Sequence, residues 1–292
     1  MKSLASTDLS AEPAVDIPIR APLRWDPRLY QIATLAGLLG YGMWWLDLDV
    51  QPLTAVAIIA TALGTQRACE RLAGRPRFDP RSALISGLSL CLLLRSGSMA
   101  VAMLTAVVAI ASKFTLRASG KHVFNPTNFA LIAMLLVTES VWVSPGQWGS
   151  GVVFAFLLAS AGSLVVNRAA RADVTWTFLA CRAALLVGRS LWLGEPLAIP
   201  LHRMENGALI LFAFFMISDP KTTPDSRAGR FLFAALVALG AHVVQFWLFQ
   251  TNGLLWSLVI CSLAVPLIDR LLPGRRYQWR STDTPPGERN LV

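Results

Sequence analysis

Apolar stretches of roughly membrane-spanning length recur along the chain, and short polar segments with Arg, Lys, Pro or Gly separate them. This pattern predicts ten membrane-spanning helices. Their expected ranges are 30–47, 51–66, 82–95, 98–113, 125–142, 150–167, 174–192, 206–218, 230–249 and 253–269. A complete spanning helix needs about 20 residues. The two shortest ranges, 82–95 and 206–218, are therefore candidates for broken or half-helices.

The composition places the chain in the same class. Of its 292 residues, 54% are hydrophobic and 15% are charged, whereas a soluble domain carries about 25% charged residues. The four cysteines are scattered singly and form no C-x-x-C motif, which indicates neither a disulfide framework nor an iron–sulfur cluster. We therefore predict an all-α polytopic membrane protein in contact with a lipid bilayer.

The net charge of +9 is explained by orientation in the membrane. If the N-terminus is cytoplasmic, all but four of the 26 Lys and Arg residues fall on the cytoplasmic side. The four exceptions are Arg95, Arg182, Arg189 and Arg203. The positive-inside rule then predicts a multi-pass protein of the inner (plasma) membrane with both termini in the cytoplasm. No nucleic-acid partner is needed to explain the charge.

The two halves of the chain resemble each other weakly. RSALISGLSL (81–90) corresponds to ENGALILFAF (205–214), and HVFNPTNFALIAMLL (122–136) to FQTNGLLWSLVICSL (249–263). Each half would hold five spans, so the second would be inverted, with a site at the interface of the two repeats. The predicted organisation is a flexible leader, two five-helix repeats and a flexible tail. These occupy 1–29, 30–142, 150–272 and 273–292.

The first polar motif, SGKHVFNPTNF (119–129), interrupts two apolar stretches. Asn125 is expected to cap the helix that begins at Pro126. A cap alone would explain the Asn-Pro pair, but it does not explain why Gly120, Lys121, His122 and Asn128 gather at the same helix entrance. Free N–H groups beside a lysine and amide side chains are suited to binding an anion or phosphate.

The second polar motif, MISDPKTTPDSRAGR (216–230), follows an unbroken apolar run. Asp219 is expected at the inner membrane boundary, where Lys221 can neutralise it, and Thr222 and Thr223 offer hydroxyl groups. An ordinary helix terminated by Pro220 would give the same pattern. However, both motifs fall on the cytoplasmic side and belong to opposite halves, so we expect Asn125 and Asp219 to meet at one site.

Two further polar residues lie inside predicted spans. Arg182 falls near the middle of 174–192, and His242 lies within 230–249. Charged groups at bilayer depth cost several kcal/mol and usually face a cavity or partner. Both are candidates for an ion pathway or cavity. The sequence holds no H-E-x-x-H or P-loop motif, so it indicates no metal site and no self-contained catalytic site.

The motifs F-N-P at 124–126 and S-D-P-x-T-x-P at 218–224 resemble the signature segments of one membrane family. It comprises the D subunit of the Rnf electron-transport complex and the B subunit of the Na⁺-translocating NADH:quinone reductase. The resemblance covers about residues 25–275 and implies a membrane flavoprotein with a fold like that of urea and ammonium channels. Such a protein passes electrons within a larger complex and is linked to ion movement. The signature residues carried over are Asn125, Pro126, Asp219, Pro220, Thr222 and Thr223.

The chain departs from this family at one point. The family attaches FMN covalently through the threonine of an S-G-A-T-like segment, whereas the corresponding VTESVWVSPGQWGSG (137–151) contains no such motif. The extramembrane insertion typical of that region is also missing. The chain therefore looks like a compact, divergent relative, and any FMN or riboflavin would be bound non-covalently.

These observations favour an electron-transport component that binds a flavin or quinone-like group between its repeats. It would be coupled to ion translocation and would receive electrons from a membrane or soluble partner protein. It would be one component of a membrane oxidoreductase. The alternatives are an inverted-repeat transporter or channel that has lost the flavin, and a structural membrane anchor. The predicted binding residues are Lys121, Asn125, Pro126, Thr127, Asn128, Asp219, Lys221, Thr222 and Thr223.

Overall fold

The computed structural model describes residues 26–45, 49–75, 78–143, 159, 162–163, 165–167 and 171–277. Most of the predicted leader, most of the predicted span 150–167 and the end of the tail lie outside the described residues. The first half contains α1 Pro27–Trp45, α2 Pro52–Leu72, α3 Arg81–Leu93, α4 Met99–Thr115 and α5 Pro126–Val137. Helix α1 thus begins inside the predicted leader, at a proline that is well suited to the first turn of a helix.

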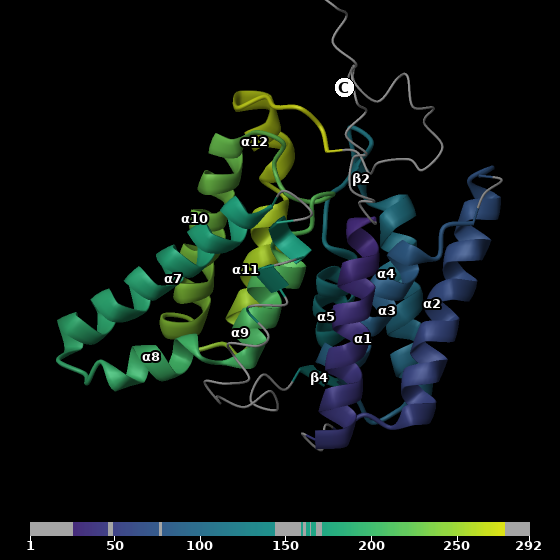
Figure 1. Ribbon diagram of the computed structural model, residues 1–292, viewed down its shortest axis with the longest axis horizontal. Helices are drawn as coiled ribbons and strands as arrows, with labels where there is room; N and C mark the ends of the chain where they lie inside the picture. The colour runs from purple at the N-terminus through teal and green to yellow at the C-terminus, as the bar shows by residue number, and fades with distance from the viewer. Residues whose placement is uncertain are drawn as a thin grey trace, which may run out of the picture.

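The second half is also helical. It contains α7 Ala172–Leu193, α8 Ala198–Met204, α9 Gly207–Leu211, the π-helix η2 Phe212–Met216, α10 Arg227–Phe246, α11 Gly253–Ser262 and α12 Val265–Leu271. Figure 1 shows helices α1 to α5 gathered on one side of the molecule and α7 to α12 on the other. Helix α10 packs against α7 and α11, α2 packs against α3 and α4, and α11 contacts α5 where the two groups meet.

Among the described residues, two helices are long and apolar enough to cross a membrane, namely α7 and α10. Helices α11 and α12 count as a third if they are one span bent by 49°. Four shorter apolar helices accompany them: Arg81–Leu93, Met99–Thr115, Pro126–Val137 and Gly207–Met216. The structure therefore supports a membrane protein with several short helices, and the complete set of ten spans stays a prediction.

Two short helices in the first half, α3 and α5, are followed by strands that pair with each other. Helices α3 and α5 have 13 and 12 residues, and each leads towards a strand, β1 Leu94–Ser96 or β4 Val141–Val143. The two strands pair antiparallel. The predicted helix over 125–142 is therefore wrong beyond Val137: Thr138 has an extended backbone, and β-branched valines in β4 complete the ladder with β1.

Helices α5 and α11 are joined at their first turns. Asn125 caps α5 by accepting a hydrogen bond from the Asn128 N–H at 3.1 Å, and Pro126 is the first helical residue. The Asn128 side chain then donates to the carbonyl of Leu255, in the first turn of α11, at 3.1 Å. The predicted cap is present, and the same motif also links the two halves of the chain.

Candidate functional site

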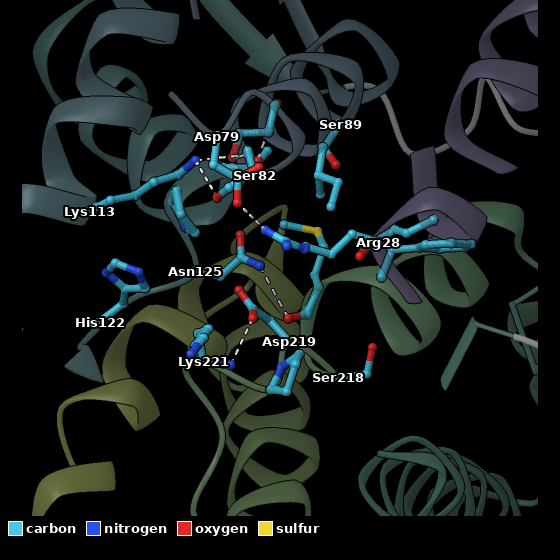
Figure 2. A pocket seen from close by; sticks show the side chains of 18 of the residues that line it. Arg28, Asp79, Ser82, Ser89, Lys113, His122, Asn125, Ser218, Asp219 and Lys221 are labelled. Atoms are coloured by element: carbon cyan, nitrogen blue, oxygen red, sulfur yellow. Dashed lines mark hydrogen bonds and ion pairs between the residues drawn. The ribbon is translucent and has the colours of Figure 1, made fainter. Parts of the chain in front are cut away.

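A cavity of about 220 Å³ lies where the two polar motifs converge. The first motif contributes Asn125, Pro126 and Thr127 to its wall, and the second contributes Asp219 and Lys221. Figure 2 shows Asn125 and Asp219 close together in this cavity, with His122 and Lys221 beside them. The structure therefore brings together five of the nine predicted binding residues.

Backbone geometry at the end of η2 positions the second motif. The Asn125 side-chain amide donates to the carbonyl of Met216 at 3.3 Å, which ties the start of α5 to the end of the π-helix. Asp219 then accepts a hydrogen bond from the backbone N–H of Lys221 at 2.9 Å. Burial raises the pKa of the Asp219 carboxyl, while this hydrogen bond and the nearby Lys113 and Lys221 partly lower it.

The expected neutralisation of Asp219 by the Lys221 ammonium is not what the structure shows. The Lys221 ammonium instead donates to the carbonyl of Tyr277 at 3.4 Å. The physical reason is local: after Pro220 the chain turns tightly, so the backbone N–H of Lys221, and not its long side chain, meets the carboxylate.

Lys113 is a cavity residue that the sequence interpretation missed. It is 5% exposed, and its ammonium donates to the carbonyl and the hydroxyl of Ser82 at 2.9 and 3.0 Å. Its position at the end of a long apolar run is the sequence signal that could have indicated burial. The other cationic side chains in the wall are Arg28, Arg75, Arg117 and Lys221.

Acidic and amide groups from α2 and the following loop balance these cations. Gln66 and Glu70, one turn apart on α2, are joined by a 2.7 Å hydrogen bond. Asp79 forms an ion pair with Arg28. The Gln66 Oε1 and Glu70 Oε2 atoms are buried and have no hydrogen-bond partner among the described residues. The wall of the cavity thus carries both signs of charge and buried acceptors that a ligand could use.

A tight hairpin presents His122 to the cavity. Strands β2 Arg117–Ala118 and β3 Lys121–His122 pair antiparallel. The two-residue turn between them has positive φ at both positions, 51° at Ser119 and 78° at Gly120, as a type I′ turn requires. Burial, together with the nearby cations Arg117 and Lys113, lowers the pKa of His122 to about 4. The imidazole is therefore neutral at neutral pH, and its buried Nδ1 has no hydrogen-bond partner among the described residues.

Four of the predicted binding residues do not line this cavity. Lys121 lines a second cavity, where it forms ion pairs with Asp225 and Asp269, both at 3.0 Å. Asn128 links α5 to α11, as described above. Thr222 and Thr223 are buried and support the loop: the Thr222 hydroxyl donates to the Asp219 carbonyl at 3.3 Å, and Thr223 accepts from Arg171 at 3.0 Å.

Arg182 and His242 line neither of the two cavities described above. They lie together beside Phe246, with the Arg182 guanidinium 6.0 Å and the His242 ring 4.7 Å from the centre of that ring. Their role in an ion pathway stays a prediction. No group of three or more His, Cys, Asp or Glu side chains suited to a metal ion occurs within the described part of the chain.

Residues 137–278 match the family model described as "NQR2, RnfD, RnfE family". Over these residues the chain is similar to this family. The match includes the motif with Asp219 and begins after the motif with Asn125, so the recognised segment supplies one wall of the cavity. The family resemblance predicted from the two motifs is therefore confirmed.

Curated relatives agree with this family. The chain is similar to proteins named as the D subunit of an "ion-translocating oxidoreductase complex". That of Sodalis glossinidius is 33% identical over 114 residues, which are 38% of this chain and 33% of the relative. That of Escherichia fergusonii is 30% identical over 141 residues, 44% and 40% of the two chains. That of Escherichia coli K12 is 29% identical over 139 residues, 48% and 35%. The chain thus spans well under half the length of these curated relatives.

Proposed function

We propose that the chain is an integral membrane electron-transport component of the RnfD type. It would hold a flavin or quinone-like redox group non-covalently between its two halves and act, coupled to ion translocation, within a larger oxidoreductase complex. The observation that carries this proposal is the cavity in which Asn125 and Asp219 meet. The names of the relatives support membership of a complex, and other components of such a complex would be its electron-donating partners.

The cavity wall has the groups that a flavin needs. Phe114 and Phe215 offer apolar ring surface, and the unpartnered atoms of Gln66 and His122 offer hydrogen bonds to a polar ring edge. The cationic side chains suit a phosphate, as in FMN. A bound flavin would supply the capacity to accept and donate electrons. This chain would bind it, orient it and exclude water from it.

The arrangement of short helices supports an inverted repeat. In the first half the short helices α3 and α5 are the third and fifth predicted spans, and in the second half the corresponding elements, α9 with η2 and α11, have ten residues each. Asn125 and Asn252 stand at the N-caps of α5 and α11, the corresponding helices. Short, interrupted helices at matching positions are typical of repeats that build a site at their interface.

A cytoplasmic position of the site follows from the charge distribution. The cavity gathers Lys113 and Arg117 from one segment and Lys221 from another, and the positive-inside rule assigns both segments to the same face. We therefore propose an inner-membrane protein with both termini and the cavity on the cytoplasmic side.

The test begins with the protein purified in mild detergent. Flavin absorbance and fluorescence are recorded before and after acid precipitation, and quinone is sought in an organic extract. We expect flavin in the acid supernatant, and a reduced flavin-to-protein ratio in the Asp219→Leu variant. Arg227→Gln, an exposed substitution outside the cavity, is the matched control and should keep the wild-type ratio. Flavin that stays in the pellet would contradict non-covalent binding.

A transporter or channel is the second candidate. Two observations favour it: the missing S-G-A-T-like motif, and a wall in which Glu70, Asp79 and Asp219 face several cations. A protein free of flavin and quinone after gentle purification, with substrate flux across liposome membranes, would replace the redox proposal with this one. A protein without flavin, quinone or flux would point to the structural anchor.

A further inference from the structure

Four basic residues fall outside the cytoplasmic side in the predicted topology, and three of them lie around one aromatic ring. The guanidinium carbons of Arg182, Arg189 and Arg203 lie 6.0, 4.4 and 4.9 Å from the centre of the Phe246 ring. They come from the middle and the end of α7 and from α8. Figure 1 places α8 at the end of the molecule opposite α12 and β2. We call these three residues the Phe246 arginine cluster.

Positive charge in this cluster exceeds negative charge. Within the described part of the chain, its one ion pair joins Arg189 to Glu195 at 2.9 Å. Arg182 is 5% exposed and donates from Nη2 to the side-chain oxygen of Gln245, while its Nη1 is buried without a hydrogen-bond partner. Two guanidinium groups are therefore without a carboxylate among the described residues.

Internal interactions account for part of this arrangement. The face of an aromatic ring attracts cations, and the end of α10 at Phe246 carries the negative end of the helix dipole. Neither interaction supplies an acceptor for the buried Nη1 of Arg182. Three like charges around one ring also repel each other, since each guanidinium carbon lies within 6.0 Å of the ring centre. An anion placed between them would remove both costs.

We propose that the Phe246 arginine cluster binds a phosphate group. Planar guanidinium groups form paired hydrogen bonds to phosphate oxygens, and a buried unpartnered Nη1 next to an exposed Arg203 suits an anion that enters from the surface. Exposed apolar side chains lie on the same elements: Leu193 at the end of α7 is 50% exposed, Leu201 on α8 61%. Headgroups of anionic phospholipids carry phosphate beside apolar chains and bind at such basic sites. The source of the phosphate is therefore a lipid headgroup, and inorganic phosphate is the competing source.

The experiment compares the wild-type protein with Arg203→Gln, which removes an exposed member of the cluster. Arg227→Gln is the matched control, because Arg227 is also an exposed arginine over a phenylalanine, 5.5 Å from the centre of the Phe231 ring at the other end of α10. Arg203→Lys keeps the charge and loses the planar donor pair. Melting temperature in detergent is measured against added phosphatidylglycerol, phosphatidylcholine and inorganic phosphate.

We expect phosphatidylglycerol, but not phosphatidylcholine, to raise the melting temperature in a saturable way. Arg203→Gln should weaken the apparent affinity about tenfold, as expected for one lost arginine–phosphate contact. Arg203→Lys should fall between, and Arg227→Gln should match the wild type. An equal effect of inorganic phosphate would support the phosphate site and identify a soluble anion as its source. Equal responses of Arg203→Gln and wild type, or no response to either ligand, would overturn the proposal.

Discussion

The two cationic regions of this protein solve the same electrostatic problem differently. Around the two cavities, buried cations have internal partners: Lys121, in the second cavity, lies between Asp225 and Asp269, and Lys113, in the first, donates to Ser82. At the Phe246 arginine cluster, three arginines share one carboxylate among the described residues. A region that neutralises its own charge can be held by the fold alone, whereas a region that does not gains most from an outside anion. The comparison therefore separates cations that the fold itself pairs from cations that are left for an outside anion.

The largest effect is expected from Lys121→Met. The Lys121 ammonium is 9% exposed and bridges two largely buried carboxylates, so its removal leaves Asp225 and Asp269 uncompensated. Removing one partner of a buried ion pair costs about 3–5 kcal/mol. We expect a loss of this size in the free energy of unfolding, measured by denaturant titration in mixed micelles.

Asp269→Asn and Arg203→Gln sharpen this first comparison. Asp269→Asn in the Lys121→Met background should recover part of the lost stability, because it removes one of the two stranded charges. Arg203→Gln alone should change the unfolding free energy by less than about 0.5 kcal/mol without lipid, since the side chain is exposed. If Lys121→Met cost no more than Arg203→Gln, the division into paired and unpaired regions would be wrong.

His122 gives the next largest effect, as a dependence of stability on pH. Its folded pKa is lowered to about 4, below the ordinary value of 6.5, so between these values the unfolded chain binds the proton more strongly. Stability should therefore be complete above about pH 6.5 and fall as the pH drops towards 4. The loss is at most about 2 kcal/mol, after allowance for a partly exposed ring. The measurement is the unfolding free energy at pH 7 and pH 5.

His122→Gln is the variant that isolates this contribution, because it should flatten the change between pH 7 and pH 5. Asp219 works in the opposite direction: its folded pKa is raised, so its protonation favours the folded state as the pH falls. A pH slope that is identical in wild type and His122→Gln would mean that burial of His122 does not limit stability in acid.

Local sequence signals predicted the parts of the site that depend on local chemistry. Asn125-Pro126 specified a capped helix start, and Asp219-Pro220 specified the end of a helix. The meeting of these motifs followed from counting spans and basic residues. The S-D-P-x-T-x-P motif predicted the family similarity, and the matched residues include Asp219. In each case the signal is carried by a few adjacent residues with restricted backbone geometry.

What the sequence could not predict depends on contacts between distant segments. The pairing of β1 with β4 ends α5 at Val137, although the apolar pattern continues to 142. Lys113 enters the cavity because Ser82, on another helix, accepts its hydrogen bonds. The convergence of Arg182, Arg189 and Arg203 on Phe246 joins three helices. Hydropathy and charge counts along one chain do not show which distant residues come into contact.

The last prediction asks whether the hydrogen bonds made by the Asn125 side chain matter mainly for ligand binding and less for stability. Asn125→Ala removes the cap of α5 and the hydrogen bond to Met216. Asn206→Ala removes a similar cap at the start of α9, where the Asn206 side chain accepts a hydrogen bond from the Ala208 N–H at 2.8 Å. Each cap is worth about 1 kcal/mol, so both variants should lose similar stability in thermal unfolding.

Only Asn125 of these two lines the cavity, and Asn125→Ala alone should therefore lower the flavin-to-protein ratio. An equal loss of flavin in both variants would show that stability, and not the cavity wall, controls binding. An unchanged ratio in Asn125→Ala would instead argue against flavin at this part of the cavity wall, and only the Phe246 arginine cluster would then retain the properties of a ligand site.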